Sequence, residues 1–278
     1  MLLHEILKAF VLGVVQGVTE WLPVSSTGHL ILLDEILRLD VSADFMELFR
    51  VVIQFGSIAA VLLLYGRRLD PWHTEKSPAE RRICLSLWGR IFLASLPAAA
   101  VGFLADDWLD EHFYHPVPVA VMLALIGAAL IVAEKHPPHG QPICTAAEDV
   151  GIGSALVIGC FQVLSLLPGT SRSGSTILGG LTAGLSRTAA AEFSFFLAIP
   201  VMAGASLLKT VKFLVGSGFA FSSSELLLLL VGTVTAFLVS VLVIRFLLDL
   251  IRRRSFAGFG WYRIALTVVV LVVTLVNP

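Results

Sequence analysis

The chain has 278 residues, of which 57% are hydrophobic and 14% are charged, and its mean hydropathy is +0.91. A soluble domain carries about 25% charged residues because its surface meets water. This composition therefore excludes an ordinary soluble domain and predicts a surface that meets lipid. The formal net charge of -1 excludes a strongly basic nucleic-acid binder. The three cysteines have no paired spacing, so neither a zinc site nor a disulfide framework is expected.

The first apolar stretch, residues 5–40, starts as a helix-like run and then breaks at a polar cluster, Pro23–His29. Irregular backbone is tolerated at membrane depth only where it is buried in protein or lines a wet cavity. We therefore predict a re-entrant helix–break–helix hairpin at this position. The alternative is an ordinary helix end at the membrane surface.

Three apolar stretches follow in the first half of the chain, each close to the roughly 20 residues that a spanning helix needs. They cover residues 49–65, 90–105 and 117–133. The second half repeats this order, with an apolar stretch at 150–182 that breaks at Pro168–Thr176. Three further spans follow it, at residues 186–208, 225–248 and 260–277. The pattern predicts an all-α polytopic membrane protein with about six transmembrane helices and two re-entrant helix hairpins.

The two breaks resemble each other in sequence. Each follows a Gly-x-x-Gln motif and a proline, and each has a serine three residues after the proline. The matching residues are Gly13, Gln16, Pro23 and Ser26 in the first break and Gly159, Gln162, Pro168 and Ser171 in the second. Interrupted apolar segments at corresponding positions of two halves point to a mid-membrane site at the repeat interface. We predict one membrane domain, 1–278, with repeat halves of approximately 1–134 and 150–278.

The charges of the connecting segments predict the orientation. Segment 66–90 carries six Lys and Arg residues against three acids, and segment 249–255 carries three consecutive arginines, whereas segment 105–116 carries four acids and no Lys or Arg. Basic segments stay on the cytoplasmic side. Both termini are therefore expected outside, and the two hairpins would enter from opposite faces, which makes the repeat an inverted one.

The first break contains residues suited to a reaction at phosphorus. Gln16 lies one helical turn before Glu20, so both side chains are expected on one helix face. Ser25 or Ser26 is a candidate nucleophile, and His29 or Glu20 is a candidate for the acid or base that assists it. Glu20 is equally a candidate ligand for a divalent cation, because one or two carboxylates with phosphate oxygens commonly hold Mg²⁺. The alternative for both serines is a helix-capping role.

The second break has the composition of a phosphate cradle. Arg172 carries a permanently charged fork that matches phosphate oxygens. Four hydroxyl groups surround it in the sequence, on Ser171, Ser173, Ser175 and Thr176. Gly169 and Gly174 let backbone N–H groups approach an anion, and the start of the next helix also favours one. The alternative is a Ser/Gly-rich hinge with a snorkelling arginine.

Three motifs match a known family. They are Gln16-x-x-x-Glu20, Leu22-Pro23-Val24-Ser25-Ser26-Thr27-Gly28-His29 and Pro168-Gly169-x-Ser171-Arg172-Ser173-Gly174-x-Thr176. In these motifs, and along nearly its whole length, the chain resembles the undecaprenyl-pyrophosphate phosphatase family of the bacitracin-resistance type. That family has Glu or Gln at the first motif position, and Gln16 argues against a mechanism that needs two carboxylates there.

The resemblance implies hydrolysis of a C55 isoprenyl pyrophosphate to the monophosphate, which recycles the carrier lipid for cell-wall synthesis. It implies a bacterial inner (cytoplasmic) membrane, a site open to the periplasmic side and a divalent cation, Mg or Ca. The implied catalytic residues are Glu20, Ser26, His29 and Arg172. The implied substrate-binding residues are Gln16, Ser25, Thr27, Ser171, Ser173 and Thr176. Expected partners are the isoprenyl pyrophosphate lipid and the bilayer, with no nucleic acid, and a homodimer stays open.

Two other functions compete with this hypothesis. A transporter or flippase of phosphate-bearing isoprenyl lipids would also use an inverted repeat with broken helices, although simple binding does not require the group of Glu20, Ser26 and His29. A lipid phosphatase of the acid-phosphatase-like type would need a histidine after its Ser-Arg element. No histidine follows Arg172 in this chain, which excludes that class. Among the phosphatase mechanisms we favour Ser26 as nucleophile, with His29 as the alternative.

Overall fold

The computed structural model describes residues 2–34, 37–217 and 221–276, and this part of the chain forms helices and no strands. The elements are α1 (Leu2–Thr19), α2 (Ser26–Asp34), α3 (Ala43–Leu69), α4 (Pro78–Phe113), α5 (Pro116–Lys135), η1 (Ala147–Asp149), α6 (Ile152–Val163), η2 (Leu164–Leu166), α7 (Arg172–Thr182), α8 (Arg187–Ser217), α9 (Ser223–Arg253) and α10 (Ala257–Val276). The prediction of an all-α protein is confirmed.

Seven helices among the described residues are long and apolar enough to cross a membrane by length and composition. Six of them, α3, α4, α5, α8, α9 and α10, contain the six predicted spans to within one residue at either end of a span, apart from residue 277, which lies outside the described residues. The seventh is α1, which we had assigned to the first hairpin and which reaches 18 residues. The chain is therefore a multi-pass membrane protein. The re-entrant course of the α1–α2 and α6–α7 pairs stays a prediction.

The two polar clusters are shorter breaks than the sequence suggested. Most of each cluster belongs to a helix, because α2 begins at Ser26 and α7 begins at Arg172. The non-helical backbone is confined to residues 20–25 and 167–171. The serine just before each helix closes its first turn, which moves the start of the helix into the polar cluster. The connection predicted over residues 66–90 is also shorter than expected, because α3 runs to Leu69 and α4 begins at Pro78.

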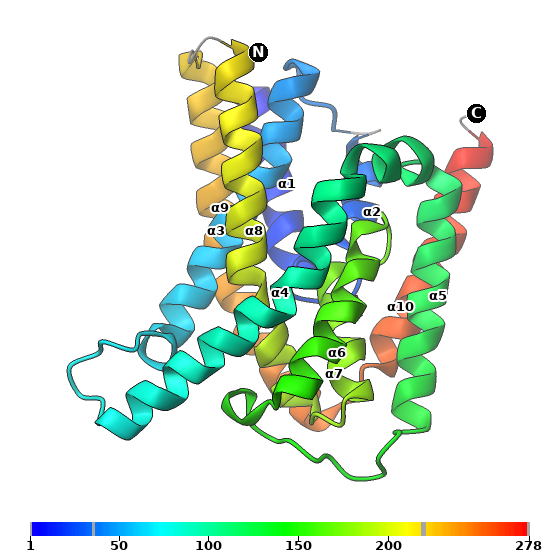
Figure 1. Cartoon of the computed structure of the whole chain (residues 1–278). Helices are drawn as coiled ribbons and strands as arrows, with labels where there is room; N and C mark the ends of the chain where they lie inside the picture. Colours follow the sequence, from blue (N-terminus) through cyan, green and yellow to red (C-terminus); the bar gives the residue numbers. More distant parts are fainter. Residues whose placement is uncertain (1, 35–36, 218–220, 277–278) are drawn as a thin grey trace.

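Figure 1 shows how the helix ends are distributed along the bundle. The first turn of α1 and the last turn of α10 lie at the top of the view, and the connections 70–77 and 136–146 lie at the bottom. The two ends of the chain thus share one side of the bundle, as the threading of the predicted spans requires. Which side faces the cytoplasm stays a prediction.

Glycines bring each broken pair close to a helix from the other half of the chain. A Cβ atom on Gly13 of α1 would lie 2.6 Å from the carbonyl oxygen of Gly232 on α9. A Cβ atom on Gly159 of α6 would lie 2.6 Å from the carbonyl oxygen of Ala94 on α4. Without side chains at these points the helix backbones can approach closely. The glycines matched between the two halves therefore each allow a helix of one half to pack closely on a helix of the other.

Candidate active site

Each break ends in a serine that caps the following helix in a strained conformation. Ser25 has φ 75° and Ser171 has φ 70°, which makes them the two described non-glycine residues with positive φ. The Ser25 hydroxyl accepts a hydrogen bond from the Gly28 N–H (3.2 Å), and the Ser171 hydroxyl accepts one from the Gly174 N–H (3.1 Å). Residues in this region cost about 1–3 kcal/mol and cluster at functional sites. The capping alternative therefore holds for Ser25.

These caps correct the register between the two breaks. Counting from the proline had paired Ser26 with Ser171, but the structural counterpart of Ser171 is Ser25. Each capping serine stands nine residues after the glutamine of its motif, Gln16 or Gln162. The proline lies one residue later in the first break, so counting from it shifted the alignment.

A buried carboxylate joins the two breaks. Glu20 is 6% exposed. Its Oε1 accepts a hydrogen bond from Arg172 Nη2 at 2.9 Å. Its Oε2 accepts from Gln16 Nε2 at 2.8 Å and from the Ser26 hydroxyl at 3.3 Å. The structure thus brings three of the predicted site residues to the carboxyl group of a fourth, Glu20.

Arg172 is oriented by contacts that the sequence did not reveal. Its Nη1 donates to the Ser194 carbonyl at 2.7 Å and to the Ser194 hydroxyl at 3.2 Å. The guanidinium carbon also lies 5.5 Å from the centre of the buried Trp21 ring, a cation–π distance. Thr176 supports the same assembly, because its hydroxyl lies 2.6 Å from that of Ser194. The cation is therefore held in place from three sides.

A cavity of about 190 Å³ opens beside this cluster. Its lining combines residues of both breaks with residues of α3 and α8: Glu20, Ser26, Gln54, Ser165, Leu167, Gly169, Ser171, Arg172, Val201, Met202 and Ala205. Ser171 lines it as predicted, and Gln54 adds an amide that sequence reasoning missed. Because the cavity combines one acid, one cation and several hydroxyls, it suits an anionic group that reacts with a hydroxyl.

Two other predicted binding residues support the backbone of the site. The Ser173 hydroxyl donates to the Leu22 carbonyl at 3.1 Å and is nearly fully buried, so it ties the second break to the first. Ser25 is also fully buried. The side chain of Thr27 lies outside what the structure describes.

His29 lies apart from the carboxylate cluster. Its Nδ1 is 2.7 Å from the Ser25 carbonyl, and its Nε2 is 2.7 Å from the Tyr262 hydroxyl. A carbonyl can only accept, so Nδ1 carries the proton, and in the neutral ring Nε2 accepts from Tyr262. The imidazole lines a separate apolar groove of about 830 Å³, together with residues of α1, α9 and α10. In this arrangement Glu20, and not His29, is hydrogen-bonded to Ser26.

The site offers a limited set of groups to a metal ion. Across the described ranges, no cluster of three or more His, Cys, Asp or Glu residues is placed to hold one. The Gln16 Oε1 atom is buried and has no hydrogen-bond partner among the described residues, and the amide nitrogen of the same side chain contacts Glu20. One carboxylate and one unpaired amide oxygen fit a divalent cation that takes its other ligands from a phosphate-bearing substrate and from water.

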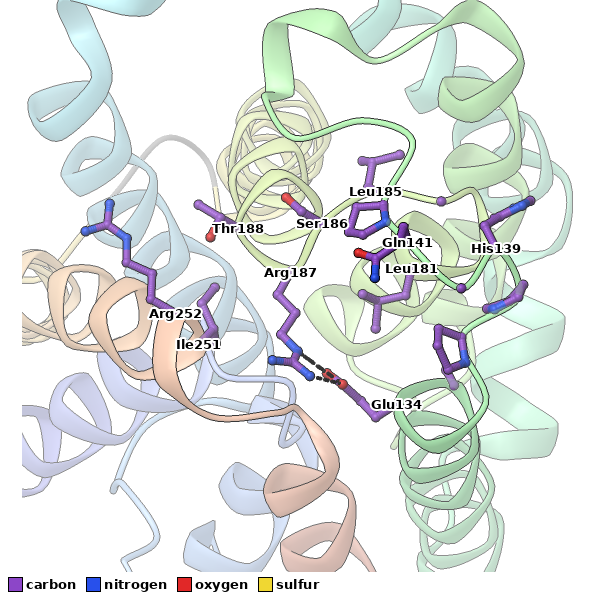
Figure 2. A pocket seen from close by; sticks show the side chains of 16 residues that line it. Glu134, His139, Gln141, Leu181, Leu185, Ser186, Arg187, Thr188, Ile251 and Arg252 are labelled. Carbon is purple, nitrogen blue, oxygen red and sulfur yellow. Dashed lines mark hydrogen bonds and ion pairs between the residues drawn. The ribbon is translucent and has the colours of Figure 1, made fainter.

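A second polar pocket, of about 480 Å³, is lined mainly by residues 133–142 and 181–188. Figure 2 shows its charged centre, where Arg187 Nη2 lies 2.7 Å from Glu134 Oε2. None of the predicted site residues lines this pocket. The pocket between the breaks is lined by Glu20, Ser26, Ser171 and Arg172, and it is therefore the stronger candidate.

The fold and the site define a class: a multi-pass helical membrane protein with a buried acid–arginine–serine site between two broken helices. The chain belongs to the bacitracin resistance protein BacA family, whose sequence profile matches residues 9–269. An undecaprenyl-diphosphatase from Enterococcus faecalis is 49% identical over 271 residues, which is 98% of each chain. One from Acetivibrio thermocellus is 50% identical over 96% of this chain and 97% of its own. One from Streptococcus mutans is 49% identical over 98% of this chain and 96% of its own.

Proposed function

We propose that this chain is an integral membrane phosphatase that hydrolyses undecaprenyl diphosphate to undecaprenyl phosphate and phosphate. The observation that carries the proposal is the pairing of Ser26 and Arg172 on the two oxygens of Glu20. Ser26, Glu20 and Arg172 line one cavity, and in the proposal they serve as the nucleophile, the acceptor for its proton and the cation for the phosphoryl group. Relatives named undecaprenyl-diphosphatase along the full chain support the choice of substrate.

In the proposed first step, the Ser26 oxygen attacks the terminal phosphorus while Glu20 Oε2 takes the hydroxyl proton. The bond from that phosphorus to the bridging oxygen breaks, and undecaprenyl phosphate leaves with the electron pair. Glu20 then gives up this proton to solvent and is a carboxylate again. In the second step Glu20 takes a proton from the water that attacks the phosphoserine. The bond between phosphorus and the Ser26 oxygen breaks, the proton passes from Glu20 to that oxygen, and phosphate is released.

Arg172 and the two helix N-termini supply the electrostatic part of the mechanism. Phosphoryl transfer depends mainly on positioning and on stabilising the charge of the transferred group. The guanidinium donates to phosphate oxygens with fixed geometry, and the first N–H groups of α2 and α7 favour an anion. Ser171 and Gln16 are proposed to contact the substrate, whereas Ser25, Ser173 and Thr176 hold the surrounding backbone.

A proton-handling role for His29 requires a change in the direction of its ring. Its ring would have to leave Tyr262 and turn towards the cavity that holds Glu20 and Ser26. If the ring keeps its observed direction, His29 instead stabilises the start of α2 through its hydrogen bond to the Ser25 carbonyl.

A divalent cation, Mg or Ca, is also part of the proposal. Glu20 and the unpaired oxygen of Gln16 would hold it together with diphosphate oxygens. When bound, it would neutralise charge on the diphosphate. Gln16 offers a neutral oxygen, so Glu20 is the one carboxylate that the motif contributes to the cation.

We further propose that the protein lies in the bacterial cytoplasmic membrane with the site open to the periplasmic face. The support is the distribution of charge, because Arg67 and Arg68 precede a connection at the end of the bundle opposite both termini. Single cysteines at positions 75 and 108, in a cysteine-free background, test it: position 108 should react with an impermeant thiol reagent in intact cells, and position 75 should not. A homodimer is a proposal that light scattering in detergent would test.

The deciding assay is phosphate release from C55 diphosphate by the purified protein, with and without a chelator. We expect one phosphate per lipid and a loss of activity with the chelator that added Mg²⁺ or Ca²⁺ restores. Tight binding of the lipid without phosphate release would contradict the enzyme and favour the transporter.

A further inference from the structure

Arg263 contacts the backbone of both breaks, and the proposed mechanism assigns it no role. Arg263 of α10 is fully buried, at 0% exposure. Its Nη1 donates to the Pro23 carbonyl at 3.2 Å, in the first break. Its Nη2 donates to the carbonyls of Gly169 and Thr170, both at 2.9 Å, in the second break. One guanidinium therefore holds the backbone of both breaks.

The same side chain is anchored to a third element. Arg263 Nε donates to the Leu123 carbonyl at 3.2 Å, and Nη2 lies 3.4 Å from the Met122 carbonyl, both on α5. Five backbone carbonyls from three segments thus surround the cation. A Cβ atom on Gly174 would lie 3.2 Å from Nη1, so the guanidinium also lies against the first turn of α7.

The charge of Arg263 is balanced differently from that of other arginines in the bundle. Arg68, Arg172 and Arg187 each pair with a carboxylate, but no ion pair to Arg263 is present in the part of the chain that the structure describes. A buried charge costs several kcal/mol unless hydrogen bonds compensate it. Here the compensation comes from carbonyl groups, and it is complete only while both breaks keep their places. The cation therefore stabilises one particular arrangement of the breaks.

The clamped carbonyls stand next to the residues that shape the site. Thr170 directly precedes the strained cap Ser171, and Pro23 lies two residues before the strained cap Ser25. Each cap fixes the start of a helix, and these helices begin with Arg172 and Ser26. A shift of either carbonyl would move the cation relative to the hydroxyl that must attack the same phosphoryl group.

We propose that Arg263 is a positioning residue for phosphoryl transfer, which sets the distance between Ser26 and Arg172 by clamping the two breaks to α5 and α10. This inference rests on the proposed function. Arg263 acts through backbone carbonyls and makes no contact with substrate. Lysine in its place keeps the charge but has a compact ammonium that cannot serve three segments at once.

The test compares Arg263→Lys with wild type in the C55 diphosphate assay, on protein that elutes as one species and melts cooperatively. A misplacement of about 1 Å can cost about 100-fold in rate. We expect kcat to fall by about that factor with KM nearly unchanged, because the substrate-binding groups are all present. Hydrogen exchange should rise in both breaks, at residues 20–25 and 167–171.

Arg187→Lys is the matched control, since Arg187 also makes several hydrogen bonds between helices but lines the other polar pocket (Figure 2). We expect it to lower the melting temperature and leave kcat of the folded protein unchanged. If Arg263→Lys does not fold, Arg263→Gln is measured in its place. Hydrogen exchange of that variant then shows whether protection is lost mainly in the two breaks, as we expect, or throughout the bundle. A kcat near wild type in folded Arg263→Lys, or exchange that rises equally throughout the bundle, would overturn the inference. Absence of phosphate release by the wild type would instead reject the proposed function.

Discussion

Ser26 and Arg172 occupy the same position in the two breaks, since each is the first helical residue after a serine cap with positive φ. The backbone around them is alike, but one side chain is a neutral hydroxyl and the other is a permanent cation. In the proposed mechanism one is the nucleophile and the other stabilises charge. Two similar helix starts thus form one site when their N-termini converge on Glu20.

The breaks also differ in what holds them. Arg172 is fixed by Glu20, Ser194 and Trp21, all at or near the cavity. The first break is held on the side of the apolar groove, where His29 links the Ser25 carbonyl to Tyr262. Arg263 holds the backbone of both breaks, so the difference lies in the further contacts: those of a charged side chain, Arg172, in the second break, and the link through His29 in the first. Substitutions in the two breaks should separate these effects.

The largest effect is expected for Arg172→Ala, which removes the cation from the second break. An arginine that stabilises a phosphoryl group contributes about 10³–10⁵ in kcat, so turnover should nearly vanish in the phosphate-release assay. The change also leaves Glu20 buried without its ion pair, and breaking such a pair costs about 3–5 kcal/mol. The double variant Arg172→Ala/Glu20→Gln should regain melting temperature without regaining turnover. Substantial turnover in the single variant would contradict the assignment.

Ser26→Ala removes the hydroxyl at the equivalent position of the first break. We expect a loss of turnover as large as that of Arg172→Ala but with little change in melting temperature, because no buried charge is left unpaired. Acid quenching of the wild-type reaction followed by mass spectrometry should detect phosphate on Ser26. Near-normal turnover of Ser26→Ala would move the nucleophile to His29 or to water.

Glu20→Ala and Gln16→Ala test whether the carboxylate of Glu20 or the amide of Gln16 assists the reaction of Ser26. Loss of a general base typically costs about 10²–10⁴ in rate, and Glu20→Gln should fail as badly as Glu20→Ala because an amide cannot take the proton. Gln16→Ala should be milder, and its main effect should be a higher requirement for divalent cation. A greater loss in Gln16→Ala than in Glu20→Ala would reverse the assigned roles.

The sequence predicted six of the seven described helices that are long and apolar enough to span a membrane, and it singled out residues that meet in the candidate site, because local patterns reveal both. Long apolar runs predict helices, and Glu20 and Arg172 stood out as ionisable groups in apolar segments. The direction of His29 was not predictable, since it depends on Tyr262, 233 residues away. Arg263 was overlooked although it is a charge within the predicted span 260–277, the signal that identified Glu20. Its role became visible only once carbonyls of three distant segments were placed around it.

The smallest effects are expected at the caps, where the two breaks should behave alike in stability. Ser25→Ala and Ser171→Ala should each cost about 1 kcal/mol of stability and lower turnover modestly by loosening the first turns of α2 and α7. Ser171→Ala should also raise KM, because this hydroxyl is proposed to contact the substrate. Glycine at either position should be better tolerated than alanine, because it adopts positive φ without strain. Ser222, which caps α9 with φ -71°, is the control: there the loss of the cap should reduce the melting temperature without reducing turnover. If Ser25→Gly were no better than Ser25→Ala, the strained backbone would not be what the two breaks have in common.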